Sequence, residues 1–356
     1  MPQRDIVVIG GSAGAIAPLK DIVGSLPASF PASILIVTHL SPDYNGNLDE
    51  LLSRISSLPV SMAVDAEPIR QGRIYLARPD NHLSVGPGRI RVVKGPRENR
   101  HRPAVDALFR TAARVYGSRV IGIVLSGLLD DGSAGLYAVK QRGGIAIVQD
   151  PAEARFPEMP RHALFYATPH YVLRAQDIAA NLINLVQIDQ DEIVMPAKQS
   201  GNPKSTSKKA ARREPGGRPD ENLNVAYFDE GVGTPSVFAC PECHGVLWEL
   251  KDGHLVQFRC RVGHTYGMNS LAKEMSDGTE AALWAAMRAL EEKAAMQRRL
   301  ADTLAGDPKA GLRFRDQAAA DDANARLVRD MIFRRDAALE AARRDEPKEE
   351  RKKKSA

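Results

Sequence analysis

The chain has 356 residues, a formal net charge of +5 and a hydrophobic fraction of 43%, enough for a buried core and for two domains. No apolar run approaches the roughly 20 residues of a membrane helix, so we expect no membrane insertion. An apolar run begins almost at the N-terminus, which leaves no room for a signal peptide and predicts a cytoplasmic protein. The densest basic tracts, 204–218 and 348–354, are typical of solvated linkers and tails, and no nucleic-acid partner is expected.

Apolar runs alternate with amphipathic stretches over residues 5–187. We predict buried strands at 6–9, 34–37, 120–125 and 145–148, and helices at 18–26, 104–116, 133–142 and 176–187. The shorter, more alternating runs 73–77 and 90–93 predict a small antiparallel excursion. The alternation predicts an α/β fold, namely a doubly wound, mostly parallel sheet with helices on both faces.

The turn after the first strand is rich in glycine and carries a serine. Gly10-Gly11-Ser12-Ala13-Gly14 fits G-x-S-x-G, the strand-to-helix turn that presents a nucleophilic serine. A dinucleotide site would need G-x-G-x-x-G and an acidic residue about 20 positions later, but Ser12 holds the second glycine position and the next strand ends in Thr38-His39. A nucleotide-binding domain is therefore the less favoured alternative.

A second strand brings a histidine to the same edge of the sheet. His39 is placed to serve Ser12 as a general base, which a carboxylate behind it would orient. Asp130, Asp131 and Asp150 follow later strands and all compete for that orienting role. Asp130 or Asp131 would also suit the N-cap of the helix that follows them. Periodicity alone does not choose among the three acids.

Five motifs, in order, resemble the CheB family of protein-glutamate methylesterases. They are residues 9–14, Thr38-His39, 73–77 leading to His82, 101–110, and 125–132. The resemblance implies a triad of Ser12 as nucleophile, His39 as base and Asp131 as orienting acid, and so it selects among the acids. It also implies that catalysis needs no cofactor.

The resemblance implies a hydrolase that demethylates glutamate γ-methyl esters on a chemoreceptor or a similar signalling protein. Glutamine deamidation is a second activity associated with the family. The oxyanion is expected to meet the backbone N–H groups of Ala13 and Leu128, with Gly127 as an alternative to Leu128. A signalling scaffold that keeps the fold but has lost turnover is the competing hypothesis.

The sequence departs from the family in three respects. It starts at the catalytic strand, where chemotaxis enzymes begin with a receiver domain, so we expect control by a receiver or kinase acting in trans. Leu128-Leu129 stands where the family commonly shows Met-Gly, and 155–160 differs from its usual Phe-Gly-Met-Pro segment. These loops are expected to lie near the cleft and to affect substrate preference.

The second half of the chain carries a metal-binding pattern. A catalytic domain is predicted over 1–190 and a flexible linker over 191–233. Cys240-x2-Cys243 and Cys260-x3-His264 then predict a zinc-ribbon-like module over 234–270. Three thiolates and an imidazole form a closed tetrahedral set, so we predict a structural Zn²⁺.

The C-terminal region predicts a helical hairpin over 271–345 and a disordered charged tail over 346–356. Apolar and small residues alternate in steps of four and three from Leu283 through Ala294 to Leu304. A second helix over 316–344 is expected to place Leu327 and Met331 on one side, together with Ala338. Self-packing is the default for this seam, and self-association through it is the alternative.

Overall fold

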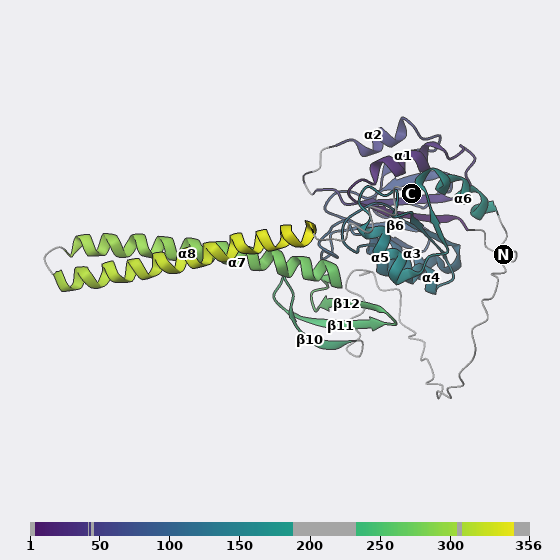
Figure 1. Ribbon diagram of the computed structural model, residues 1–356. Coiled ribbons are helices and arrows are strands. Elements are labelled where there is room, and N and C mark those ends of the chain that lie inside the picture. Colours follow the sequence, from purple (N-terminus) through teal and green to yellow (C-terminus); the bar gives the residue numbers. More distant parts are fainter. Residues whose placement is uncertain (1–3, 42, 44–45, 188–232, 305–307, 345–356) are drawn as a thin grey trace, which may run out of the picture. The chain divides into compact units, whose positions relative to one another are not determined.

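The computed structural model, drawn in Figure 1, describes residues 4–41, 43, 46–187, 233–304 and 308–344. It divides into two compact units, Met1–Leu271 and Ala272–Ala356, which we describe separately. The predicted linker, apart from residue 233, and the predicted tail lie outside the described residues. Among the helices of the described ranges, none combines the length and the apolar character that crossing a membrane requires.

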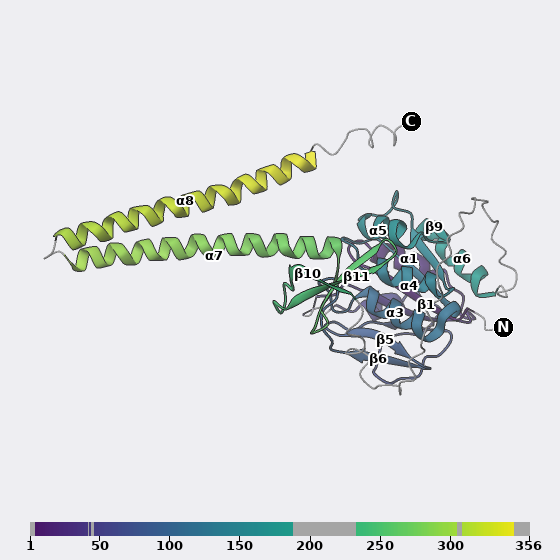
Figure 2. The same cartoon turned by 90° about the horizontal axis from the view of Figure 1, so that it is seen from below.

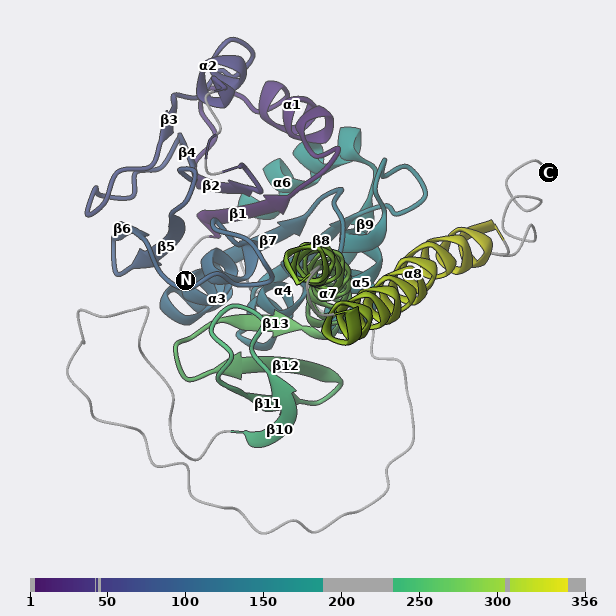
Figure 3. The same cartoon turned by 90° about the vertical axis from the view of Figure 1, so that its left-hand side faces the viewer.

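The first unit is built on a seven-stranded sheet in which every pairing is parallel. Its strand order is β3-β4-β2-β1-β7-β8-β9, as Figure 3 shows. The strands are β1 (Ile6–Gly11), β2 (Ser33–Thr38), β3 (Val60–Met62), β4 (Arg73–Leu76), β7 (Val120–Val124), β8 (Ile145–Gln149) and β9 (Tyr171–Leu173). The direction of winding reverses between β1 and β7, and ligands of open α/β sheets bind outside the carboxyl ends of strands at such a point.

Helices cover both faces of this sheet (Figure 1). One face packs against α1 (Ile16–Gly24), α2 (Leu48–Ser53) and α6 (Ala175–Gln187), and the other against α3 (Val105–Tyr116), α4 (Ser133–Gln141) and α5 (Glu158–Ala167). Along β1, Val7 and Ile9 enter one apolar cluster and Ile6 and Val8 enter the other. A strand buried on both faces needs an unbroken apolar run, and the doubly wound fold predicted from those runs is confirmed.

Of the two runs predicted to form a small antiparallel excursion, the first does not do so. Residues 73–76 form β4, which pairs in parallel with β2 inside the main sheet, and its Ile74, Tyr75 and Leu76 are buried. The second run lies in β6 (Arg89–Val93), which forms an antiparallel ribbon with β5 (His82–Gly86), drawn beside the sheet in Figure 2. A short 3-10 turn, Gly117–Arg119, leads into β7. β4 has only four residues and begins with Arg73, so its apolar run is too short to identify a strand that is buried on both faces.

The first unit also contains a small antiparallel sheet of four strands. These are β10 (Thr234–Ala239), β11 (Val246–Asp252), β12 (Leu255–Cys260) and β13 (Thr265–Gly267). Its buried cluster holds only six residues, including Leu247, Phe258 and Tyr266. So small an apolar core rarely stabilises a fold without a cross-link or a metal.

The second unit is a hairpin of two long helices, which confirms the predicted C-terminal helices. They are α7 (Met268–Thr303), whose first residues belong to the first unit, and α8 (Pro308–Arg344). Lys293 pairs with Asp321 at 3.1 Å and Arg298 with Asp322 at 2.6 Å across the hairpin. The seam expected on α7 is buried at Ala294, Gln297 and Ala301.

The face predicted for α8 is wrong. Leu327 and Met331 are 60% and 59% exposed, whereas Ala318, Ala325 and Ile332 are buried. These three positions recur every seven residues, as in a helical seam. The two alanines let the helix backbones approach, so the contact face cannot be found from the largest apolar residues alone.

Candidate functional site

Ser12 and His39 follow neighbouring parallel strands at the same edge of the sheet. The register of β1 and β2 ends with Gly11 opposite Thr38, so the next residues, Ser12 and His39, lie one strand apart. The His39 N–H continues the pairing by donating to the Gly11 carbonyl at 3.3 Å. Adjacent strands are about 4.8 Å apart, so residues 12 and 39 leave the sheet as neighbours at this edge.

The Ser12 turn is held by the segment that follows β7. The Ser12 N–H donates to the Ser126 carbonyl at 2.9 Å, and the Ser126 Oγ donates to the Ala13 carbonyl at 2.8 Å. A Cβ on Gly127 would lie 2.9 Å from the Ser12 Cβ, so only glycine allows this approach. Gly14 has φ +75°, which also favours glycine. Ser12 itself is half-buried and so remains accessible from solvent.

The imidazole of His39 contacts one of the three candidate acids. Its Nε2 lies 2.7 Å from the Asp131 Oδ2, and the two side chains are only 5% and 1% exposed. The other ring nitrogen, Nδ1, is buried and has no hydrogen-bond partner within the described residues. A hydrogen bond to the carboxylate fixes Nε2 as the protonated nitrogen and leaves the Nδ1 lone pair free to accept a proton.

Backbone N–H groups fix the Asp131 carboxylate. Oδ2 accepts from the Val105 N–H at 2.7 Å, and Oδ1 accepts from the N–H groups of Asp106 at 3.1 Å and Gly132 at 3.0 Å. The Asn99 side chain donates to Oδ1 at 2.9 Å. Val105 and Asp106 are the first residues of α3, so the carboxylate occupies the N-terminus of a helix, where negative charge is favoured.

Burial and the neighbouring His39 shift the pKa of the Asp131 carboxyl in opposite directions. Burial raises the pKa of the Asp131 carboxyl, but the hydrogen bond and charge of His39 outweigh it, and the pKa lies below its ordinary value. His101 stacks on the His39 ring with centroids 3.5 Å apart. Burial, and then the neighbouring His39, lower the pKa of His101 to about 3. His101 is therefore a neutral ring at physiological pH, packed against the imidazole.

The other two acids have different partners. Asp130 is buried and accepts hydrogen bonds from the Asn269 N–H at 3.0 Å and from the Ser270 hydroxyl. Asp150 accepts from the Ala152 N–H at 2.8 Å in its own turn. Neither Asp130 nor Asp131 caps α4, whose N-cap is Gly132 without a side-chain cap. The expectation that one of these aspartates caps that helix is therefore wrong.

Two backbone donors were expected for an oxyanion. The N–H groups of Ala13 and Leu128 have no protein acceptor within the described part of the chain. The Gly127 N–H, the alternative donor, is excluded because it donates to the Phe156 carbonyl at 2.9 Å. Ala13 and Leu128 stay predictions for this role.

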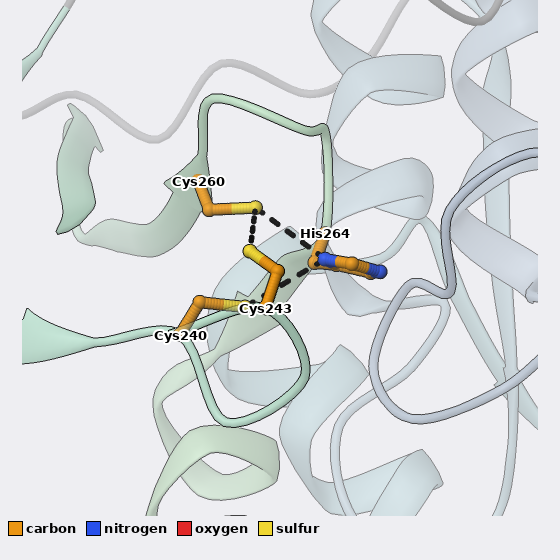
Figure 4. Close-up of side chains that lie close together, drawn as sticks. All are labelled: Cys240, Cys243, Cys260 and His264. Atoms are coloured by element: carbon orange, nitrogen blue, oxygen red, sulfur yellow. Dashed lines mark hydrogen bonds between the residues drawn. The ribbon is translucent and has the colours of Figure 1, made fainter. Parts of the chain in front are cut away.

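The four predicted metal ligands lie together (Figure 4). The His264 Nδ1 lies 3.7 Å from the Cys240 Sγ and 3.5 Å from the Cys260 Sγ, and the Cys243 and Cys260 sulfurs are 3.5 Å apart. All four ligand atoms are within 4.8 Å of one another. Zn–S bonds of 2.3 Å in a tetrahedron place sulfurs roughly 3.8 Å apart, so these residues fit a four-coordinate zinc ion.

Comparison with known proteins matches the N-terminal half. The family described as CheB methylesterase matches residues 7–182. A Leptospira interrogans protein, assigned as a protein-glutamate methylesterase/protein-glutamine glutaminase, is 37% identical over 184 residues, which are 51% of this chain and 95% of the relative. A Methanosarcina mazei protein-glutamate methylesterase/protein-glutamine glutaminase 2 is 32% identical over 192 residues, 52% of each chain. The crystal structure of the Thermotoga maritima CheB methylesterase catalytic domain has 36% identity and a TM-score of 0.49, covering 51% of this chain and 98% of that chain.

Proposed function

This chain belongs to the CheB methylesterase family, and we propose that it is a serine hydrolase that removes methyl groups from glutamate γ-methyl esters of a signalling protein. The observation that carries the proposal is the contact between the His39 Nε2 and the Asp131 carboxylate, because His39 follows β2 as Ser12 follows the neighbouring strand β1. The names of the similar proteins from Leptospira interrogans and Methanosarcina mazei support the same reaction.

The proposed reaction has two steps. The Ser12 Oγ attacks the γ-carbonyl carbon while His39 Nδ1 accepts the hydroxyl proton. His39 then returns that proton to the leaving methoxide, so methanol departs and an acyl-enzyme remains. Water attacks the acyl group with His39 again as base, which restores the Ser12 hydroxyl and leaves a free glutamate. Asp131 holds the ring and stabilises the imidazolium that forms in each step.

The negative oxygen of each tetrahedral intermediate needs hydrogen-bond donors. Ala13 and Leu128 are the proposed donors, because their N–H groups adjoin the Ser12 turn and are not used elsewhere in the described residues. One such donor stabilises the transition state by about 3 kcal/mol. The same attack on a glutamine side chain would release ammonia, so we include glutamine deamidation in the proposal.

The test of this function is methanol release from a methylated chemoreceptor. We expect the full chain to release one methanol for each glutamate formed, and ammonia from a receptor that carries glutamine at the same sites. Absence of both products in the presence of receptor would favour the signalling scaffold instead. Tight dinucleotide binding without hydrolysis would favour a nucleotide-binding domain.

Two further proposals concern the partners of this chain. One is control by a receiver or kinase acting in trans, and the other is self-association through the helical hairpin.

We also propose that Cys240, Cys243, Cys260 and His264 hold a structural zinc ion. Four protein ligands leave no open coordination position, and the bound metal would supply folding free energy that the small core of this sheet lacks. We expect about one zinc per purified chain, measured by plasma mass spectrometry, and loss of that zinc when Cys240→Ser and Cys243→Ser are combined. Val237→Ser, on the 94% exposed Val237 of β10, the strand that leads to Cys240, is the matched control and should keep the metal. Equal zinc in the double variant would contradict this site.

A further inference from the structure

Asn99 connects the proposed triad acid with the metal-binding sheet. The side chain is buried, with the residue only 1% exposed. Its Nδ2 donates to the Asp131 Oδ1 at 2.9 Å and to the Asp106 Oδ2 at 2.8 Å. Its Oδ1 accepts from the Gly267 N–H, in β13, at 2.8 Å. One buried amide therefore joins two carboxyl groups to a strand 168 residues later in the sequence.

The backbone around Asn99 is held by the same strand. The Asn99 N–H donates to the Thr265 carbonyl at 2.7 Å, and the Thr265 N–H donates to the Arg97 carbonyl at 3.4 Å. Asn99 has φ +48°, a left-handed conformation that asparagine adopts more readily than most residues. β13 makes two hydrogen bonds with Asn99, in which the Thr265 carbonyl accepts from its backbone N–H and the Gly267 N–H donates to its side-chain oxygen.

β13 begins one residue after a proposed metal ligand. His264 immediately precedes Thr265, and the His264 carbonyl accepts from the Cys260 N–H at 3.0 Å. The strand that positions Asn99 is thus covalently continuous with the turn that would close around the metal. We expect loss of the metal to loosen this turn, because the buried cluster of the sheet is small and the bound metal would supply part of its folding free energy.

A second contact reaches the residue next to the triad acid. The Asn269 N–H and the Ser270 hydroxyl donate to the Asp130 carboxylate. A Cβ on Gly267 would lie 2.3 Å from the Asp130 Oδ2, so the backbone there approaches as closely as a glycine allows. Residues 265–270 therefore hold the Asp130-Asp131 pair both directly and through Asn99.

Resting on the function proposed above, we propose that the metal-binding sheet positions the Asp131 carboxylate through Asn99, so that metal occupancy sets the turnover of the esterase. Asn99 acts through Asp131 and is a positioning residue. When the metal is removed, β13 no longer holds Asn99, and the carboxylate loses one of the donors that fix its orientation. A small displacement of an orienting group lowers turnover by about 10- to 100-fold, while substrate binding is expected to stay the same.

The test compares metal removal with removal of the Asn99 side chain in the full chain. Using a glutamyl methyl ester, we expect a metal chelator to lower wild-type kcat about tenfold with KM unchanged. Asn99→Ala should lower kcat by a similar factor, and chelation of that variant should lower it less than twofold further, because both changes break the same link. Asn81→Ala is the matched control, since the Asn81 side chain donates to the Pro79 carbonyl, at 2.9 Å, in its own turn, and the variant should respond to the chelator like the wild type.

Two kinetic outcomes would overturn this inference. One is an unchanged wild-type kcat in protein shown to have lost its metal. The other is an equal loss on chelation in the wild type and in Asn99→Ala. Thermal unfolding of each sample identifies any loss of kcat that comes from an unfolded catalytic domain.

A second readout needs neither a variant of Asn99 nor activity. In chains labelled with ¹⁵N-histidine, we expect the His39 ring signals, assigned with His39→Gln, to shift when the metal is removed. His39 signals that stay unchanged after complete metal removal would overturn the inference. If the metal-loaded wild type shows no esterase activity that depends on Ser12, the proposed function fails, and this spectrum still decides whether the sheet is coupled to the His39–Asp131 pair.

Discussion

Replacement of Ser12 by alanine is expected to lower kcat/KM for a glutamyl methyl ester by at least about 10³-fold. The variant lacks the Oγ that attacks the ester. The neighbouring Ser126 cannot easily replace it, because its hydroxyl donates to the Ala13 carbonyl and accepts from the Phe156 N–H at 3.0 Å. Initial rates of methanol release, at matched protein concentrations, measure this loss.

Ser25→Ala provides the matched control for the Ser12 variant. The Ser25 hydroxyl donates to the Asp21 carbonyl at 2.7 Å on an exposed part of the same domain. Its removal should leave the hydrolysis rate unchanged. If Ser12→Ala hydrolysed the ester as fast as Ser25→Ala, the activity would come from another residue.

Asp131→Asn is expected to lower kcat by about 10³- to 10⁴-fold. The two carboxylate oxygens accept five hydrogen bonds, from His39, Asn99 and three backbone N–H groups. An amide would turn an NH₂ group toward donors at one of these positions and could not stabilise an imidazolium. A buried donor left without an acceptor costs about 1–3 kcal/mol, so the variant should also unfold at a lower temperature.

Steady-state kinetics and thermal unfolding measure the two effects of Asp131→Asn separately. Asp150→Asn is the control, because that carboxylate accepts from the Ala152 N–H in its own turn, whereas His39 contacts Asp131. It should retain the wild-type rate. A retained rate in Asp131→Asn, with the protein folded, would remove Asp131 from the proposed mechanism.

The sheet and the positions of Ser12 and His39 could be predicted because buried parallel strands have a strong local pattern. An apolar run such as 6–9 must be covered on both faces, and the carboxyl ends of parallel strands share one edge. The order of the strands brings β1 and β2 together, and the residues that follow them become neighbours. These features follow from short stretches of sequence.

The contacts of the acids could not be predicted from local pattern. Asp130 and Asp131 are adjacent, and both become buried. The N-terminus of α3 and Asn99 supply the donors that surround Asp131, whereas Asn269 and Ser270 bind Asp130. These donors lie far along the chain, so local pattern does not distinguish the two aspartates, and before the tertiary structure only the family resemblance pointed to Asp131.

Asn99 gave no signal in the sequence. It is a single polar residue in a loop, and its side-chain oxygen accepts a hydrogen bond from Gly267, which lies in the small antiparallel sheet. The metal ligands were easier to find, since Cys-x2-Cys and Cys-x3-His each place two ligands on one turn. Local spacing thus predicted the ligand cluster, while the link from that cluster to Asp131 required the fold.

Covalent labelling of Ser12 is the most direct test of the proposed nucleophile. The full chain is treated with a serine-reactive fluorophosphonate, and the modified peptide is identified by mass spectrometry. We predict a single adduct on Ser12, formed in the wild type and strongly reduced in His39→Ala. An ester-hydrolysing chain whose Ser12 stays unmodified, or is modified equally fast without the His39 imidazole, would contradict a serine activated by this histidine.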